Sequence, residues 1–295
     1  MYPAENQNRR ILCPAKINLW LQVTGKRSDG YHDLWTLMLP VDVFDEMEIS
    51  WSDTPEVEIV NEGFRIPRDR TNIIWKAYNV YRKHTGWPSR GVKVKIQKNI
   101  PAGAGLGGGS SNGAAMLKFL NTSNPSPCSI EELRHIARDV GADVPFFIEA
   151  IPAVASGIGD KLSGVYGIPS YPVLLIKPPF EVSTKTIYKS LKLTEKKALI
   201  SIDALLDAPW RLTGMLQNDL EEVTMSLYPE VRDIKEWLRR EGALEAMMSG
   251  SGPTVFGLFD SREKAEAVLE AAMERWGSSY WMRVCRVLSQ QDKKI

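Results

Sequence analysis

Cysteine and histidine are scarce in this sequence, which has three of each among its 295 residues. Cys13, Cys128 and Cys285 lie far apart, and none belongs to a CxxC pair. Closely spaced cysteines and histidines are the usual ligands of structural zinc, and paired cysteines form disulfide frameworks. The sequence therefore argues against a zinc domain and against a disulfide scaffold, and it favours a reducing compartment.

Long apolar segments and an excess of one charge are also missing. No run of about 18 apolar residues occurs, and the first ten residues, MYPAENQNRR, contain no apolar signal core. Lys and Arg total 37 against 36 Asp and Glu, so no overall positive field could hold nucleic acid or an anionic membrane. We therefore expect a cytoplasmic protein that binds neither.

Glycine, in contrast, is concentrated in one segment, where residues 101–115 read PAGAGLGGGSSNGAA. Glycine adopts positive φ angles and lets a ligand approach the main chain closely. Ser110 and Ser111 follow the glycines, and serine is favoured where a helix begins. The segment therefore predicts a loop that presents backbone amides and a helix N-terminus to a phosphate.

Three other interpretations of this glycine-rich segment are a dinucleotide motif, a Walker P-loop and a flexible linker. Gly103, Gly105 and Gly108 match the G-x-G-x-x-G dinucleotide motif after an apolar strand pattern, so a dinucleotide fold stays an alternative. That motif usually opens a domain and is followed by an acidic strand end, and neither holds here. A Walker P-loop needs Gly-Lys-Ser/Thr, which is absent. A flexible linker is disfavoured because strand and helix patterns flank the loop.

Hydrophobic periodicity predicts α+β structure in two lobes, residues 1–157 and 158–295. The first lobe is expected to contain strands at 11–23, 34–43, 46–51, 56–60 and 91–98, helices at 72–84, after the glycine loop and at 129–141, and a strand ending near 156. Residues 157–170 are expected to cross to the second lobe. There we expect strands at 171–177, 254–259 and 280–288 and helices from 183, near 199–206, and at 215–226, 229–240 and 261–276.

Four more segments carry polar residues in a distinctive order. They read PAKINL from Pro14, GYHDL from Gly30, GADVPFF from Gly141 and SGSGP from Ser249. Together with the glycine loop, this ordered set resembles the GHMP kinase superfamily from about residue 12 to residue 259. Within it, GYHDL, GLGGGSS and GADVPFF are similar to kinases that act on a cytidine diphosphate-linked methylerythritol. The resemblance implies a two-lobed fold, a ribosomal-protein-like N-terminal lobe and a ferredoxin-like C-terminal lobe, with the active site in the cleft.

The resemblance also implies roles for individual residues. Lys16 and Asp143 fall on the catalytic pair, as cation and base, although alone Lys16 would be a lysine that reaches solvent and Asp143 a turn residue. Asn72 and Lys98 fall near the adenine. The ATP phosphates are expected at the glycine loop, formed by Pro101, Ala102, Gly103, Ala104, Gly105, Leu106, Gly107, Gly108, Gly109, Ser110 and Ser111.

For the second substrate, the resemblance implies a cytosine held between two aromatic rings and hydrogen-bonded to a histidine. Tyr31 matches one ring and His32 the histidine, while Tyr188, with Phe180 as the alternative, matches the second ring. Asn18 and Thr184 are expected to contact the same substrate. The alternatives without a role in binding are turn positions for Tyr31 and His32 and a helix core position for Tyr188. The SGSGP segment is expected to face Asp143 across the cleft, although a simple turn is the alternative.

The implied activity is ATP-dependent phosphorylation of the 2-hydroxyl of cytidine diphosphate-linked methylerythritol, in the non-mevalonate isoprenoid pathway. Another acceptor (mevalonate, homoserine or a sugar) and a non-catalytic nucleotide-binding protein are the alternatives. No metal-binding cluster is expected in the chain, so Mg²⁺ should arrive with ATP. The protein is expected to be a monomer or a homodimer. One departure from the family is Asn112-Gly113, where alanines are more usual.

Overall fold

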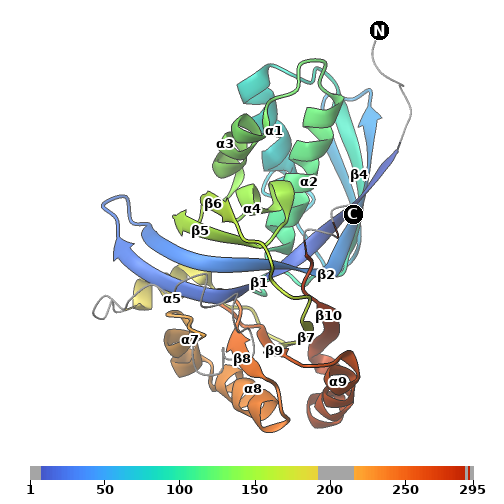
Figure 1. The fold of residues 1–295 in the computed structure, drawn as a ribbon. Helices are drawn as coiled ribbons and strands as arrows, with labels where there is room; N and C mark the ends of the chain where they lie inside the picture. The colour runs from blue at the N-terminus through green and yellow to red at the C-terminus, as the bar shows by residue number, and fades with distance from the viewer. Residues whose placement is uncertain (1–7, 192–215, 290–291, 293–295) are drawn as a thin grey trace.

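Two β-sheets form the framework of the two lobes (Figure 1). The computed structural model describes residues 8–191, 216–289 and 292. The first sheet has the order β3-β4-β2-β5-β6 with β1 paired to β2, and the second has the order β10-β7-β9-β8. The strands of the first sheet are β1 (Arg9–Lys26), β2 (His32–Ser52), β3 (Val57–Gly63), β4 (Gly91–Lys98), β5 (Ala153–Gly157) and β6 (Lys161–Gly164). Those of the second are β7 (Pro172–Lys177), β8 (Glu245–Met248), β9 (Val255–Leu258) and β10 (Trp281–Arg286).

The antiparallel pair β1 and β2 is the longest feature of the fold and curves across the molecule between the lobes (Figure 1). The prediction of two strands at 34–43 and 46–51 was wrong, because β2 continues through both. A bulge explains the apparent break: Pro14 lies opposite Phe44, whereas Ala15 lies opposite Val41. The bulge interrupts the regular alternation that the sequence prediction relied on.

Four helices cover one face of the first sheet (Figure 1). Their starts follow sequence signals: the Asn72 side chain accepts from the Ile74 N–H, and Ser129 forms the predicted capping box with Glu132. Small residues in the middle helix let it approach β1 and its neighbouring helices closely. The helices are α1 (Ile73–Thr85), α2 (Gly108–Ser123), α3 (Ile130–Val140) and α4 (Val144–Glu149).

The second lobe packs its helices against the four-stranded sheet (Figure 1). A helix over 215–226 was predicted, but the helix begins only at Glu221, because Asn218 pairs in a bridge with Leu21 of β1. The predicted helix near 199–206 lies outside the described residues. The described helices are α5 (Thr184–Ser190), α7 (Glu221–Leu227), α8 (Pro229–Arg240), α9 (Arg262–Trp276) and the short 3₁₀ helix η2 (Gly277–Ser279). No helix in the described ranges is long and apolar enough to cross a membrane.

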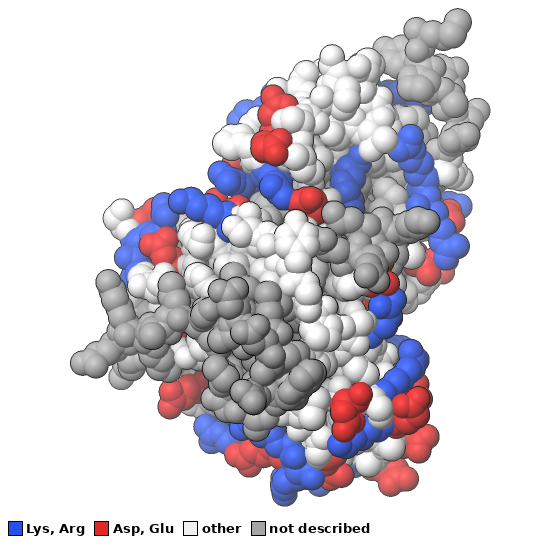
Figure 2. Space-filling model, in the orientation of Figure 1, with Lys and Arg blue, Asp and Glu red and all other residues white. Residues whose placement is uncertain are grey.

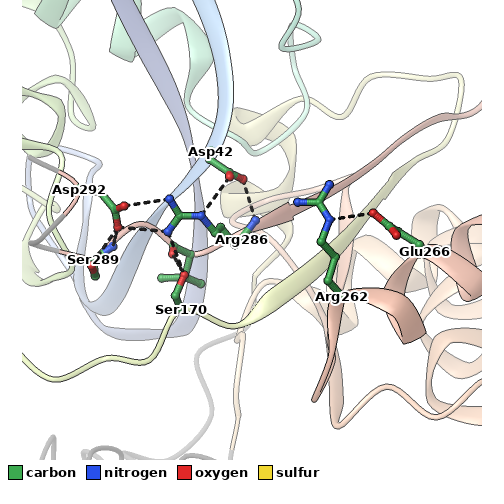
Figure 3. Close-up of polar contacts among 8 residues, drawn as sticks. Asp42, Ser170, Arg262, Glu266, Arg286, Ser289 and Asp292 are labelled. Atoms are coloured by element: carbon green, nitrogen blue, oxygen red, sulfur yellow. Dashed lines mark hydrogen bonds and ion pairs between the residues drawn. The ribbon is translucent and has the colours of Figure 1, made fainter. Parts of the chain in front are cut away.

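The end of the chain ties the second sheet back to the first. After β10, Val287 bridges Val41, and the Leu288 N–H donates to the Pro40 carbonyl at 2.8 Å. The Arg286 guanidinium lies between Asp42 of β2 and Asp292 near the C-terminus (Figure 3). These contacts join the two sheets at a second place, in addition to the segment that crosses from one lobe to the other.

The crossing between the sheets is shorter than the predicted 157–170. Strand β6 lies within that range and pairs with β5, so the hydrogen-bonded strands change sheets between Gly164 and Pro172. The division of the chain after residue 157 stays a prediction.

Candidate active site

The glycine loop adopts the conformation for which its glycines were expected. Gly103, Gly105 and Gly107 have φ angles of 59°, 77° and 69°. A Cβ on Gly105 would lie 2.2 Å from the Ser249 carbonyl oxygen, and one on Gly107 would lie 2.8 Å from Cζ of Phe147. Only glycine combines these angles with such close approaches.

The loop ends at an uncapped helix N-terminus. The N-cap of α2 is Gly107, which makes no side-chain hydrogen bond, and the first turn holds no acidic residue. Its amide N–H groups therefore keep the positive end of the helix open to an anion. Gly109 is exposed and Ser110 half-buried at this end, whereas Ser111 is buried. This geometry suits a phosphate better than a flexible linker.

Lys16 joins the glycine loop to Asp143. Its ammonium donates to the Gly105 carbonyl at 2.8 Å and lies 3.9 Å from Oδ2 of Asp143. The Lys16 side chain is 4% exposed, whereas that of Asp143 is 39% exposed at the start of α4, where it caps no backbone N–H. Lys16 is therefore fixed in the interior, and the carboxylate is accessible to a ligand.

Burial and charge act on Lys16 in opposite directions. Desolvation lowers the pKa of the Lys16 ammonium below its usual value of 10.5, and the nearby Asp143 carboxylate partly offsets this. Asn18 also stabilises the ammonium by accepting a hydrogen bond at 2.5 Å. A lysine with an acidic partner and a lowered pKa in an accessible site is typical of a functional position.

Asn18 was expected to contact the substrate, but both ends of its side chain are already engaged. Its oxygen accepts from Lys16, and its amide donates to the Thr36 hydroxyl at 2.9 Å. Thr36 in turn donates to the Trp20 carbonyl at 2.5 Å. Asn18 thus orients the ammonium of Lys16, and its predicted substrate contact stays a prediction.

The SGSGP segment comes from the second lobe and closes over the glycine loop. The Ser249 hydroxyl donates to the Gly105 carbonyl at 3.0 Å, and Gly250 lies beside Lys16 and Asn18. Ser251 shares a hydrogen bond of 2.8 Å with Thr184. This arrangement places the segment against Lys16 and the glycine loop, with Thr184 beside it, and its predicted position facing Asp143 stays a prediction.

Asn218 holds the SGSGP segment in place and was not predicted. Its side-chain amide donates to the carbonyls of Met248 and Gly250, both at 2.8 Å, while its oxygen accepts from the Leu220 N–H. Nothing in the local sequence QND distinguishes this asparagine from a turn residue. Its role depends on contacts between segments that are distant in the sequence.

Asn72 and Lys98, expected near the adenine, use their polar atoms within the protein. Asn72 caps α1 and also donates to the Pro67 carbonyl at 2.6 Å. Lys98 is 2% exposed and donates to Asp45 at 2.5 Å and to the Ile100 carbonyl at 2.7 Å. Both side chains thus bind neighbouring groups of the protein, and a direct contact of either with adenine stays a prediction.

Asp45, next to the glycine loop, is a second residue of this region that the sequence analysis did not predict. This fully buried carboxylate accepts from the N–H groups of Asn99 and Ile100, both at 2.8 Å, and from Lys98 and Asn112. It thereby anchors the residues that enter the glycine loop. The contact explains the unusual Asn112, whose amide donates to Asp45 at 3.0 Å from within α2.

Two of the three residues expected at the cytosine, His32 and Tyr188, lie together. The rings of His32 and Tyr188 are 5.2 Å apart between centroids, and Tyr31 is 60% exposed in the turn before β2. Burial and the charge of Asp143 raise the pKa of the Tyr188 hydroxyl well above 10.0, so this ring lies within the electrostatic reach of Asp143. Phe180 instead stacks on Tyr228, with ring centroids 5.1 Å apart, and the assignment of Tyr188 to the second ring stays a prediction.

The site contains no preformed protein cage for a metal. In the described part of the chain, no three His, Cys, Asp or Glu side chains lie together as metal ligands. The accessible oxygen ligands are those of Asp143 and the loop hydroxyls, which fits an ion that is held mainly by the phosphates of a nucleotide.

Comparison with known proteins agrees with this geometry. The sequence matches the GHMP kinases N terminal domain over residues 72–150 and GHMP kinases C terminal over residues 190–278. A 4-diphosphocytidyl-2-C-methyl-D-erythritol kinase of Syntrophus aciditrophicus is 45% identical over 259 residues, 87% of this chain and 92% of that protein. One from Pelobacter propionicus is 42% identical over 94% of this chain and 98% of its own length.

Solved structures are similar over nearly the whole chain. A crystal structure of 4-(cytidine 5'-diphospho)-2C-methyl-D-erythritol kinase is 32% identical, with a TM-score of 0.79, and covers 95% of this chain and 100% of that one. Homoserine kinase from Cytophaga hutchinsonii has the same fold, with 20% identity and a TM-score of 0.75 over 99% of this chain and 98% of its own. The chain therefore belongs to the 4-diphosphocytidyl-2-C-methyl-D-erythritol kinase family of the GHMP kinases.

Proposed function

We propose that this chain transfers the γ-phosphoryl group of ATP to the 2-hydroxyl of 4-diphosphocytidyl-2-C-methyl-D-erythritol. The products are ADP and the 2-phosphate, and the reaction belongs to the non-mevalonate isoprenoid pathway. The contact of Lys16 with both the glycine loop and Asp143 carries the proposal, because it joins a phosphate site to an accessible carboxylate. A non-catalytic nucleotide-binding protein would not require this pair.

Phosphoryl transfer needs a positioned acceptor and neutralised charge more than covalent help. The amides of residues 103–111 and the α2 N-terminus would hold the triphosphate. Asp143 would accept the proton of the 2-hydroxyl as its oxygen attacks the γ-phosphorus and the bond to the ADP oxygen breaks. Lys16 would keep Asp143 ionised and offset the charge on the transferring group.

Cytosine would lie between the rings of Tyr31 and Tyr188, with His32 as its hydrogen-bond partner. Support comes from the exposure of Tyr31 and from the contact of Tyr188 with His32. Stacking suits this task because a nucleobase offers an apolar face, and it contributes roughly 1–3 kcal/mol per base. Thr184 and Asn18 would border the methylerythritol end.

Mg²⁺ would enter with ATP and supply charge neutralisation at the phosphates. The accessible Asp143 carboxylate and the half-buried Ser110 hydroxyl would supply protein oxygen ligands to the ion. A cytoplasmic location and a monomeric or homodimeric state belong to the same proposal. Their tests are cell fractionation and sedimentation analysis of the purified protein.

A coupled assay of ADP release tests the activity, with the cytidylyl substrate compared with mevalonate and homoserine. Only the cytidylyl substrate should support rapid turnover, and cytidine monophosphate should compete with it.

The substitution Asp143→Asn should lower kcat by about 10²- to 10⁴-fold. Asp139→Asn on the exposed side of α3 is the matched control and should be nearly unaffected. A loss below threefold for Asp143→Asn would contradict the assignment of the base.

The cytosine site has a separate test. Tyr31→Ala should raise KM for the cytidylyl substrate about tenfold and weaken competition by cytidine monophosphate to the same degree. Tyr166→Ala removes a similarly exposed ring on the link between the sheets and should change neither value. Equal effects of the two substitutions would place cytosine elsewhere.

A further inference from the structure

A groove on the N-terminal lobe lies apart from the active site. It has a volume of about 910 Å³ and is bordered by the start of β1, by part of β2 and by the C-terminal half of α2. A cavity of about 280 Å³ shares Leu12, Phe44 and Lys118 with it. Lys118 lies ten residues after Gly108, about 15 Å along α2 from the phosphate end of that helix.

Lys118 in this groove has no counter-charge from the described residues. Its ammonium makes no hydrogen bond or ion pair with them, and burial lowers its pKa. The carboxylates that line the two cavities are already paired: Glu46 with Arg10, Glu149 with Arg134, and Asp292 with Arg286. An unpaired, half-buried cation is costly, so an external anion would stabilise it.

The walls of the groove combine positive charge with apolar surface. Among the residues that line the groove, Arg9 is a second cation that forms no ion pair with the described residues. Arg10 and Glu46, which also line it, form an ion pair with each other and add no net charge. Figure 2 shows Lys and Arg side chains along this side of the upper lobe. The apolar part is formed by Ile11, Leu12, Phe44 and Phe119.

We propose that the groove binds a small organic phosphate, a phosphate ester with a short apolar chain. A doubly charged phosphate matches the two unpaired cations, Lys118 and Arg9, and the chain would cover Leu12 and Phe44. A pocket of roughly 300–1,000 Å³ is typical of small-molecule sites. The polar part of this lining, formed by Arg9, Arg10, Glu46, Lys118 and Thr122, carries a net positive charge, which favours an anionic head group. The site is separate from the one that binds ATP and the cytidylyl substrate.

Hexyl phosphate is a suitable probe, titrated calorimetrically into the full-length protein. Saturating ADP, Mg²⁺ and cytidine diphosphate are present so that the active site is occupied. One molecule of hexyl phosphate should bind with a submillimolar Kd, whereas inorganic phosphate and hexan-1-ol should each bind at least tenfold more weakly. Absence of saturable hexyl phosphate binding would overturn the proposal.

Substitutions then locate the site. Lys118→Met should weaken hexyl phosphate binding at least tenfold, Lys118→Arg should largely restore it, and Lys95→Met on the exposed face of β4 should leave it unchanged. The thermal midpoint of each variant verifies that it is folded. Binding that is insensitive to Lys118→Met, or found only with vesicles of phosphatidylglycerol and not with hexyl phosphate, would refute a small-ligand site at this groove.

Discussion

At the scale of single residues, Gly105 lies directly against the Ser249 carbonyl of the second lobe. Its φ of 77° and the 2.2 Å approach of a built Cβ to the Ser249 carbonyl exclude any larger residue without movement. Gly105→Ala should therefore lower the free energy of unfolding by about 1–3 kcal/mol and reduce kcat sharply. Thermal unfolding and the ADP-release assay measure the two effects.

Gly109→Ala is the matched control for that substitution. Gly109 lies in the first turn of α2, and the nearest atom to a built Cβ is Cγ2 of Ile73 at 3.8 Å. Alanine should increase stability there by about 0.5–1 kcal/mol, because glycine is a poor helix former. If Gly105→Ala were as stable as Gly109→Ala, the close contact between the loops would be wrong.

The lowered pKa of Lys16 predicts the pH dependence of catalysis. Because the ammonium must be charged to support Asp143, kcat/KM should fall on the alkaline side with an apparent pKa below 10.5. Lys16→Arg should move that fall upward in whatever activity remains, since the guanidinium keeps its proton. A profile of kcat/KM from about pH 6 to pH 10 provides the measurement.

The same shift has a defined effect on stability. The pKa of Lys16 is lower in the folded protein than in the unfolded chain, so the unfolded chain binds more protons between the two values. The contribution of Lys16 to stability therefore becomes more favourable as pH rises through that window. If kcat/KM fell at the same alkaline pH in the wild type and in Lys16→Arg, the titrating group would be a residue other than Lys16.

At the scale of elements, Asp45 joins β2, β4 and α2 below the glycine loop. Asp45→Ala would leave the buried Lys98 ammonium unpaired, so we expect a loss of about 3–5 kcal/mol or failure to fold. Asn112→Ala removes only one donor to Asp45 and should cost about 1 kcal/mol. Urea unfolding of both variants measures the difference.

The milder variant keeps this prediction testable if Asp45→Ala does not fold. Asn112→Ala also introduces a better helix former into α2, which offsets part of the lost hydrogen bond. Its KM for ATP should rise no more than a few-fold, because Lys98 still holds the Ile100 carbonyl. A loss in Asn112→Ala equal to that expected for Asp45→Ala would contradict the argument that the ion pair with Lys98 is the main contribution of Asp45.

Elements with strong local signals were predicted correctly from the sequence. Helix α3 has its capping box, α1 begins at its Asn72 cap, and the loop before α2 needs its glycines for positive φ. Strand β2 and helix α7 were placed less well, because a bulge and a bridge to β1 decide them. Both depend on partners distant in the sequence, which local periodicity does not record.

The candidate site follows the same division. The glycine loop was predicted from its own composition, whereas Lys16 and Asp143 were assigned only through the resemblance to the GHMP kinases, and their catalytic roles stay predictions. Asp45 and Asn218 were missed, since an aspartate in a strand and an asparagine before a helix are common, and only the tertiary contacts give them a role. Asn72 and Lys98 were expected near the adenine by analogy with the family, whereas the structure shows their polar atoms bound to other groups of the protein, and the adenine contact stays a prediction.

At the scale of the whole molecule, β1 and β2 form part of the first sheet and also contact residues of the second lobe. Leu21 of β1 exchanges backbone hydrogen bonds with Gln217 and Asp219, and Arg286 carries β10 to Asp42 of β2 (Figure 3). The active site lies along the same boundary. We therefore expect the lobes to unfold together, because neither can open without breaking these shared contacts.

Urea unfolding, followed by far-UV circular dichroism and tryptophan fluorescence, should give one coincident transition in the wild type. The substitution Arg286→Ala should lower the free energy of unfolding by no more than about 1 kcal/mol, because the ion pairs of Arg286 are partly exposed to solvent. Asn218→Ala should cost more, about 1–3 kcal/mol, because two carbonyls of the SGSGP segment lose a buried donor. It should also reduce kcat, which Arg286→Ala should not. Two separated transitions in the wild type would show instead that the lobes fold independently and that the catalytic cleft is assembled only after both have formed.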